Sequence, residues 1–284
     1  MKNTRNQQVN IPIPKLRPFE GHPFKVKDDE EMNTLIESVQ IQGILSPLIV
    51  RPIENTDEYE VISGHRRLHA AQKAGITEVP ALIYALDRDA AAIAVVDSNL
   101  HREHILPSEK AFAYKLKRDA MAHQGRTSPQ LGEKSLTVEK IGAEAGDSKN
   151  QVLRYIRLTH LIPELLDLMD EGKIALMVGE ALSYLGDKEQ CAVLEQCEMN
   201  DCTPSYAQAI EMKKRYQGRN LTVENISEIL SREKANQRET IKISTEKLRK
   251  YAPNADAKQL EDFILKACEH YRKFLIRQRN RDER

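Results

Sequence analysis

Hydrophobic positions in the first third of the chain follow alternating helical and strand-like patterns. Apolar residues recur at i, i+3, i+4 and i+7 between an acidic cluster and Gly43, which predicts an amphipathic helix over residues 29–42. The other elements expected here are strands over 47–52, 59–63 and 79–84 and helices over 65–74 and 87–101. One more short strand is expected around 11–13, so this part reads as a small α/β unit with at most four strands.

Strand-like patterns stop after Pro107. A helix is expected over 108–123, a polar loop over 124–135, and short helices with Gly or Pro punctuation over 136–217. The fold class expected is therefore α+β and predominantly helical. We expect a small N-terminal α/β domain at 1–105, an all-α domain at 106–218 and a helical C-terminal region at 219–284, with a further boundary near 240.

Composition adds little to this picture. Lys and Arg number 43, as do Asp and Glu, so a nucleic-acid partner would have to be recognised from local clusters rather than net charge. The chain has no Trp and 5% aromatic residues, which argues against a large β-sandwich. Its four cysteines show no C-x-x-C spacing and are expected to be small core residues of a reduced protein; they are Cys191, Cys197, Cys202 and Cys268.

The sequence shows no membrane span and no secretion signal, and this sets the expected compartment. No apolar run approaches the roughly 20 residues that a membrane span needs, and residues 1–10 are polar without a signal-peptide core. The expectation is a cytoplasmic protein with no membrane partner.

A helix-turn-helix pattern runs from Thr137 to Leu161. Thr137 is expected to cap the first helix, Gly142 to allow a close crossing, Gly146 to provide a positive φ at the turn, and either Asp147 or Ser148 to cap the second helix. The alternative interpretation is a generic helical hairpin with a solvated outer face.

The early positions of the second helix carry residue types that bind DNA. Lys and Arg can contact phosphates or guanine, and Asn and Gln can pair with adenine in the major groove. No acidic residue interrupts 148–163, so this face is locally basic. The residues predicted to contact DNA are Thr137, Ser148, Lys149, Asn150, Gln151, Arg154 and Arg157.

A strand, a glycine turn and a helix follow one another around Gly64. Arg66 and Arg67 lie in the first turn of that helix, where cations oppose the helix dipole and a bound anion would relieve the cost. A second polar cluster follows at 99–103. These features favour a phosphate site; the alternative is a solvated charge pair beside an ordinary helix end.

Four motifs in order resemble the ParB-type partition family. The segments 43–51, 63–70 and 99–103, the last followed by Pro107 and Glu109, are similar to the three conserved boxes of that family. The helix-turn-helix occupies the family position, and 161–174 is similar to the segment that follows it. The resemblance covers residues 11–215.

This resemblance implies a nucleoid-associated homodimer that binds a palindromic, centromere-like site in double-stranded DNA. It also implies CTP and Mg²⁺ in the N-terminal domain, a clamp that slides along DNA, and a ParA-type ATPase partner. Carried over by position, the nucleotide-binding residues would be Ser63, Gly64, His65, Arg66, Arg67, Asn99 and Arg102, with Asn99 also on the metal side.

The chain departs from the family pattern at three positions. His65 and Ser98 stand where the family has Glu, and His101 where it has Gln. Two carboxylates suited to Mg²⁺ are thereby lost, which leaves weak CTP hydrolysis an open question. The alternatives are a transcriptional regulator without nucleotide dependence and, less favoured because no acidic cluster lies beside Gly64, a ParB-like nuclease.

The C-terminal region carries a helical apolar stripe. It could pack within the chain or against a second copy. The stripe comprises Leu260, Phe263, Ile264, Ala267, Tyr271, Phe274 and Leu275, and a basic tail follows that suits either DNA contact or plain solvation.

Overall fold

A computed structural model describes residues 8–102, 104–124, 133–200, 202–232, 248–253 and 256–282. The chain forms two compact units, Met1–Arg232 and Glu233–Arg284. None of the helices in the described ranges is long and apolar enough to cross a membrane. The predicted domain boundaries at 105 and 218 both fall inside the first unit and remain predictions.

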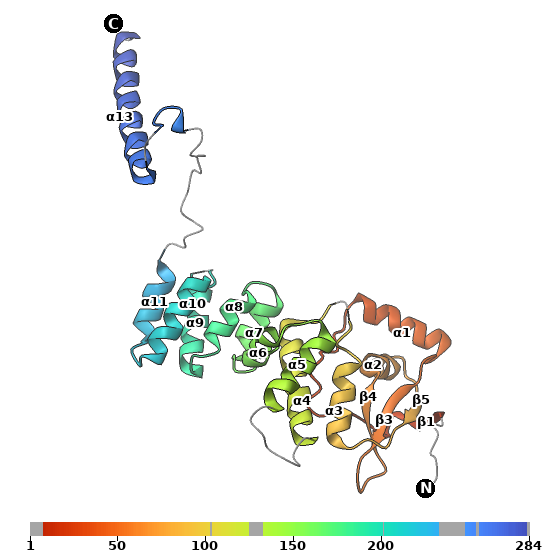
Figure 1. Cartoon of the computed structure of the whole chain (residues 1–284). Helices are drawn as coiled ribbons and strands as arrows, with labels where there is room; N and C mark the ends of the chain where they lie inside the picture. The colour runs from red at the N-terminus through yellow and green to blue at the C-terminus, as the bar shows by residue number, and fades with distance from the viewer. Residues whose placement is uncertain are drawn as a thin grey trace. The chain divides into compact units, whose positions relative to one another are not determined.

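The N-terminal part is built on a five-stranded mixed sheet in the order β1-β5-β3-β4-β2 (Figure 1). Its strands are β1 (Gln8–Pro12), β2 (Leu16–Pro18), β3 (Leu48–Pro52), β4 (Tyr59–Ser63) and β5 (Glu78–Ile83), with a 3-10 turn at Ile13–Lys15. The expectation of at most four strands was wrong. The N-terminal arm supplies both edge strands, β1 antiparallel to β5 and β2 parallel to β4. A three-residue strand is too short to show a readable alternation of apolar and polar residues, so the sequence pattern did not predict β2.

Three helices accompany the sheet: α1 (Glu30–Gln42), α2 (His65–Lys73) and α3 (Arg88–Asp97). The predicted start of α1 is confirmed, because the Asp29 side chain accepts a hydrogen bond from the Met32 amide. Met32, Leu48 and Val61 are completely buried between sheet and helices. Helix α3 ends at Asp97 instead of 101, and the next residues form a turn in which the Arg102 amide donates to the Asn99 carbonyl.

The rest of the first unit is helical, as predicted. Its helices are α4 (Pro107–Gln124), α5 (Glu133–Ala145), α6 (Lys149–Leu158), α7 (Pro163–Asp170), α8 (Leu176–Leu182), α9 (Asp187–Met199), α10 (Tyr206–Gln217) and α11 (Val223–Ser231). Most of the predicted polar loop, 125–132, lies outside the described residues. A predominantly helical α+β fold is thus confirmed.

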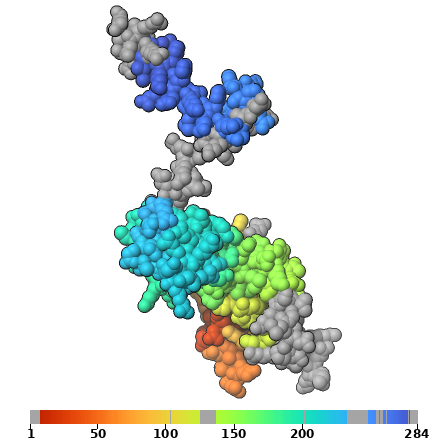
Figure 2. All heavy atoms as spheres, turned by 60° about the vertical axis from the view of Figure 1, so that its left-hand side comes forward, coloured from red at the N-terminus to blue at the C-terminus, as the bar shows by residue number. Residues whose placement is uncertain are grey.

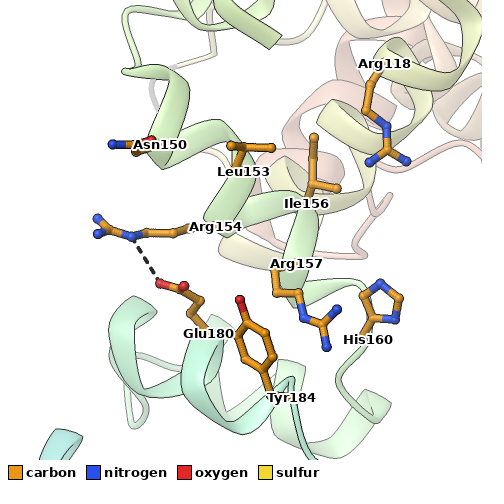
Figure 3. A pocket seen from close by; sticks show the side chains of 9 residues that line it. All are labelled: Arg118, Asn150, Leu153, Arg154, Ile156, Arg157, His160, Glu180 and Tyr184. Atoms are coloured by element: carbon orange, nitrogen blue, oxygen red, sulfur yellow. Dashed lines mark ion pairs between the residues drawn. The ribbon is translucent and has the colours of Figure 1, made fainter. Parts of the chain in front are cut away.

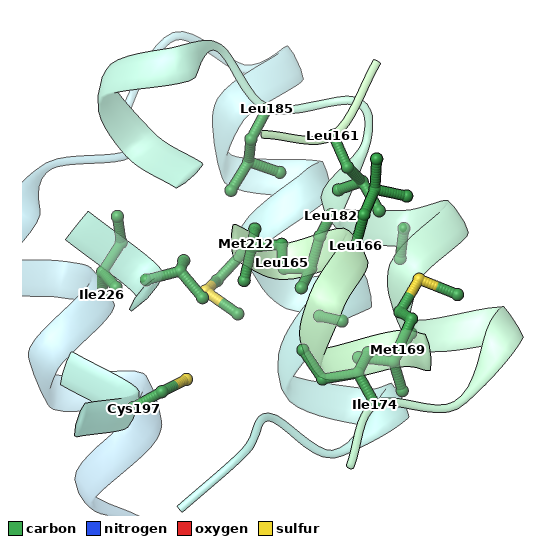
Figure 4. Packing of buried hydrophobic residues seen from close by; sticks show 14 of the residues in the cluster. Leu161, Leu165, Leu166, Met169, Ile174, Leu182, Leu185, Cys197, Met212 and Ile226 are labelled. Atoms are coloured by element: carbon green, nitrogen blue, oxygen red, sulfur yellow. The ribbon is translucent and has the colours of Figure 1, made fainter. Parts of the chain in front are cut away.

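Two apolar clusters hold these helices. One joins the sheet part to the helix-turn-helix, because Phe19, Ile62 and Val95 share a core with Tyr114 and Val152. The other fills the space between α6 and α11 (Figure 4) and includes Leu161, Leu165, Leu166, Met169, Ile174, Leu182, Leu185, Cys197, Met212 and Ile226. The continuous first cluster couples the packing of the N-terminal domain to that of α4, α5 and α6.

The second unit contains α13 (Ala257–Asp282). Figure 2 shows the side chains of this helix (dark blue) at the surface of the unit. The predicted apolar stripe lies on it, with Leu260 buried and Phe263, Tyr271, Phe274 and Leu275 exposed. Of the four cysteines, Cys197 is buried, as expected, whereas Cys191 and Cys268 are exposed, so the expectation of core cysteines was wrong for those two.

Candidate functional sites

A cavity of about 220 Å³ opens at the N-terminal end of α2. It brings together every residue that the sequence predicted for nucleotide binding, from two separate segments of the chain, and adds a third segment, residues 22–26. The lining comprises His22, Phe24, Lys25, Val26, Ser63, Gly64, His65, Arg66, Arg67, Ser98, Asn99 and Arg102.

Gly64 shapes the floor of this cavity. Its φ of 103° lies in the left-handed region, and a Cβ there would stand 3.1 Å from Leu48 Cγ and 3.2 Å from Arg67 Nη2. As N-cap of α2, Gly64 offers no side-chain hydrogen bond to the first amides of the helix. Those N–H groups and the positive end of the helix dipole therefore remain available to an anion.

The two arginines of this turn are held in different ways. Arg67 Nη1 donates to the carbonyl oxygens of Ser46 and, at 2.9 Å, of Pro47, and burial lowers the pKa of its guanidinium. Arg66 Nη2 lies 3.2 Å from Glu31 Oε2 and 3.6 Å from Asp29 Oδ1, at the start of α1. Arg67 thus fixes the segment before β3. Arg66 is paired with exposed carboxylates, and a bound phosphate could take their place as its partner.

The rings of His22 and His65 lie against each other in the cavity, with centroids 3.7 Å apart and ring planes inclined by 36°. The Phe19 amide donates to His65 Nε2 at 3.4 Å, and His22 Nδ1 lies 2.8 Å from the Phe24 carbonyl oxygen. Burial first, and then His22, lowers the pKa of His65 to about 3; burial is also the main cause that lowers the pKa of His22. Both rings are therefore neutral at pH 7.

The lining does not suit a protein-held Mg²⁺. Asn99 Nδ2 donates hydrogen bonds to the Val95 carbonyl and to Ser98 Oγ, which leaves Oδ1 as an acceptor. No Asp or Glu occurs among the lining residues within the described ranges. Because Mg²⁺ in proteins usually takes at least one carboxylate, the metal role expected of Asn99 lacks partners among the described lining residues.

The turn of the helix-turn-helix has the predicted geometry. Gly146 has a φ of 74°, and Ser148 Oγ accepts from the Gln151 amide at 3.3 Å. A Cβ on Gly142 would lie 2.5 Å from the Asp147 carbonyl oxygen. From α4, the buried Tyr114 hydroxyl donates to Asp147 Oδ2 at 2.5 Å, so the turn is fixed from below.

The capping role predicted for Thr137 was wrong. Helix α5 begins at Glu133, so Thr137 lies within the helix, one turn after its start. The sequence between Glu133 and Thr137 contains no helix-breaking residue, and a Ser or Thr at an interior position resembles a cap when sequence is read alone. Whether Thr137 contacts DNA stays a prediction.

A second cavity, of about 540 Å³, lies along α6 (Figure 3). Asn150, Leu153, Arg154 and Arg157 follow one another at i, i+3, i+4 and i+7 and form one face of that helix. The full lining is Arg118, Asn150, Leu153, Arg154, Ile156, Arg157, His160, Glu180 and Tyr184. Three of the predicted DNA residues thus share a face, whereas Lys149 lies outside the lining and pairs with Glu139 at 2.9 Å.

This face is positively charged and only partly neutralised. Arg154 Nε lies 3.1 Å from Glu180 Oε2, as the dashed line in Figure 3 marks. Arg157 donates to the Ser183 carbonyl at 2.8 Å and stacks over the Tyr184 ring, which Lys213 also approaches, at 3.4 Å from its centroid. Burial and then Arg157, Lys115 and Arg118 lower the pKa of His160. An anion on this face would relieve the repulsion between these cations.

Two features of these sites were not predicted from the sequence. The arm residues His22 to Val26 were read as part of an extended segment, although four prolines in the first 27 residues favour an ordered path. Leu153 was missed on α6, although helical spacing from Asn150 places it on the same face, where it is 44% exposed.

Comparison with known proteins gives consistent relatives. The ParB N-terminal domain model matches residues 1–100. The chain is 34% identical over 183 residues to the chromosome-partitioning protein Spo0J of Thermus thermophilus. The aligned region covers 64% of this chain and 62% of that protein. It is 30% identical over 212 residues to the probable chromosome 1-partitioning protein ParB of Deinococcus radiodurans. This aligned region covers 74% of this chain and 68% of the relative.

One solved structure with a similar sequence is the C-terminally truncated ParB of Caulobacter crescentus complexed with CTP-gamma-S. It is 27% identical, covers 67% of this chain and 98% of that chain, and has a TM-score of 0.32. The chain thus spans less than two thirds of the Thermus relative and slightly more than two thirds of the Deinococcus relative. On these sequence matches, the chain belongs to the ParB family.

Proposed function

We propose that this chain is a partition-type protein that binds a palindromic DNA site as a homodimer and uses a nucleotide, CTP, to close on DNA. The observation that carries the proposal is that all residues predicted to bind nucleotide line one cavity at the start of α2, while Asn150, Arg154 and Arg157 line a separate, basic cavity at α6. In this account the protein associates with the nucleoid, and a ParA-type ATPase moves the loaded complex, as the family resemblance implies.

The exposed face of α6 supports the DNA-reading role. The first turns of a second helix reach base edges in the major groove, and Asn150 and Arg154 lie there with side chains directed away from the core (Figure 3). A dimer is supported by the exposed apolar residues of α13, which a second copy could cover.

Arg154→Ala is expected to weaken binding to the specific site by about 1–3 kcal/mol, because a bidentate base contact is lost. The site is first identified by sequencing DNA fragments that the protein retains. Fluorescence anisotropy then compares this site with random DNA for wild type, Arg154→Ala and Glu180→Gln. The Glu180→Gln variant should bind at least as tightly as wild type, since Arg154 loses its carboxylate partner. Equal losses on both DNAs would reduce Arg154 to a phosphate contact.

Arg66→Ala is expected to abolish CTP binding while sparing DNA binding, because its guanidinium lies at the cavity and far in sequence from α6. Glu31→Gln serves as the matched control; it removes the ion-pair partner and should leave CTP binding intact or tighter. Calorimetric titration with CTP, ATP and GTP gives the measurement. Loss of DNA binding in a folded Arg66→Ala variant would refute two separate sites.

A DNA-binding regulator without nucleotide dependence is the second candidate. The observation that favours it is the lack of a carboxylate in the described lining of the α2 cavity. Absence of binding for all three nucleotides, with specific DNA binding retained, would select this candidate.

A further inference from the structure

His22 has a buried nitrogen without a hydrogen-bond partner. Among the buried side-chain nitrogen and oxygen atoms of the described residues, His22 Nε2 alone lacks one. Such atoms are rare in folded proteins and call for a physical explanation, such as a ligand. Because His22 belongs to the lining of the α2 cavity, a ligand bound there could supply the missing partner.

The hydrogen bonds around the two rings fix where their protons are. The Phe24 carbonyl can only accept, so His22 Nδ1 carries a proton and its Nε2 carries a lone pair. The Phe19 amide can only donate, so His65 Nε2 is the acceptor and its proton sits on Nδ1. Each neutral ring therefore has one defined tautomer.

The surroundings of His22 favour an anion. His65, against which its ring lies, is the first residue of α2, where the helix dipole is positive. The positive charge of Arg102 contributes to lowering the pKa of His22, and Arg102, Arg66, Arg67 and Lys25 share the cavity lining with it. The carboxylate of Glu109 acts in the opposite direction on the pKa of His22, but it lies outside the described lining and already accepts hydrogen bonds from the Lys25 and Leu106 amides.

A phosphate oxygen cannot approach a lone pair on Nε2 without repulsion, whereas a protonated Nε2 would donate to it. We propose that His22 is an anion ligand of this cavity, which takes up one solvent proton at Nε2 when a polyphosphate binds and donates that N–H to a phosphate oxygen. His22 rather than His65 takes the proton, since a proton on His65 Nε2 would face the Phe19 N–H. The inference rests on the proposed nucleotide site.

The proposal gives a defined pH dependence. In the free protein the pKa of His22 is lowered, mainly by burial and also by Arg102, so the ring is neutral at pH 7. A bound phosphate raises that pKa, and protons are then taken up on binding. Affinity must increase as pH falls from about 8 to about 6, by up to roughly tenfold per pH unit for one proton.

The test is calorimetric titration of the full chain with CTP and Mg²⁺, and separately with inorganic triphosphate. Each titration is run in two buffers of different ionisation enthalpy, which gives the number of protons exchanged. His22→Phe keeps an aromatic ring without nitrogen, and His22→Gln supplies an uncharged amide donor. His69→Gln is the control, because His69 lies outside the cavity lining and pairs with Asp28.

Wild type and His69→Gln are expected to take up close to one proton more than the two His22 variants, with both anions. At about pH 6 the His22→Phe variant should bind roughly tenfold more weakly than wild type, and near pH 8 the two should converge. Equal proton uptake in wild type and both His22 variants, with CTP bound, would overturn the inference and leave the nucleotide site standing. Absence of binding for both anions would overturn the nucleotide site and the inference together.

Discussion

Replacing Gly142 with valine is expected to abolish specific DNA binding and to lower the free energy of unfolding by about 2–3 kcal/mol. The first added carbon would meet the Asp147 carbonyl oxygen at 2.5 Å, and that oxygen belongs to the backbone of the turn between α5 and α6. The turn cannot yield easily, because Tyr114 and Lys110 both hold the Asp147 side chain. The clash therefore moves α6, the helix proposed to read DNA.

Gly146→Ala is the matched control for that change. Gly146 lies in the same turn with a φ of 74°, but a Cβ there meets no heavy atom within 4 Å. The Gly146→Ala substitution is expected to lower the free energy of unfolding only through strain of the left-handed backbone, by about 1 kcal/mol, and DNA binding should persist. Chemical denaturation and anisotropy on the identified site measure both effects. A Gly142→Val protein that binds the site like wild type would show that α6 is not fixed through this turn.

Neutralising both carboxylates that bind Lys117 is expected to cost about 2–4 kcal/mol of folding free energy at pH 7. Lys117 of α4 is 2% exposed, and its ammonium donates to Asp97 of α3 and Glu144 of α5. Burial opposes the charge, yet hydrogen bonds to Asp97 and Glu144 raise the pKa of Lys117 overall. The Asp97→Asn/Glu144→Gln variant leaves a buried ammonium without a counter-charge.

The sign of the pH effect follows from that raised pKa. The stabilisation of the fold by the Lys117 ion pairs is fully present below the pKa of a lysine in the unfolded chain, about 10.4. It is lost as pH rises through the higher pKa of Lys117 in the folded protein. Neutral pH therefore shows the full cost in a urea titration. Lys117→Met should cost less, because the carboxylates of Asp97 and Glu144 are 50% and 55% exposed and can be hydrated alone.

Asp119→Asn provides a surface control. Its carboxylate pairs with the adjacent Arg118 and is 44% exposed, so a change within about 0.5 kcal/mol is expected. A Lys117→Met variant that is more destabilised than the double amide variant would show that the unpaired ammonium is not the main cost.

Local signals in the sequence were sufficient where one segment carried all the information. The N-cap of α1 at Asp29, the positive φ of Gly146 and the cap of α6 at Ser148, one of the two residues predicted for that role, each depend on residues within one helical turn, and all three are confirmed. The turn at Gly64, which was predicted to bind phosphate, could be recognised in the sequence for the same reason, since the strand, the glycine and the arginines are consecutive.

Features made by distant segments were not visible. Strand β2 exists only because β4 offers an edge, more than 40 residues away in sequence at Leu16 and Tyr59. Lys117 looks like an ordinary helix-surface lysine until α3 and α5 enclose it. His22 joins the cavity through the fold of the arm, and Leu153 was overlooked because its apolar side chain does not resemble a DNA contact.

Nucleotide binding at α2 is proposed to be coupled to DNA binding at α6 within one chain. This coupling can be measured as retention of the protein, after a high-salt wash, on DNA that carries the identified site and has either blocked or open ends. We expect retention only with CTP and only on DNA with blocked ends, and we expect it to be lost in both Arg66→Ala and Arg154→Ala. Retention that is the same with and without CTP, or the same on open and blocked DNA, would contradict the proposed coupling.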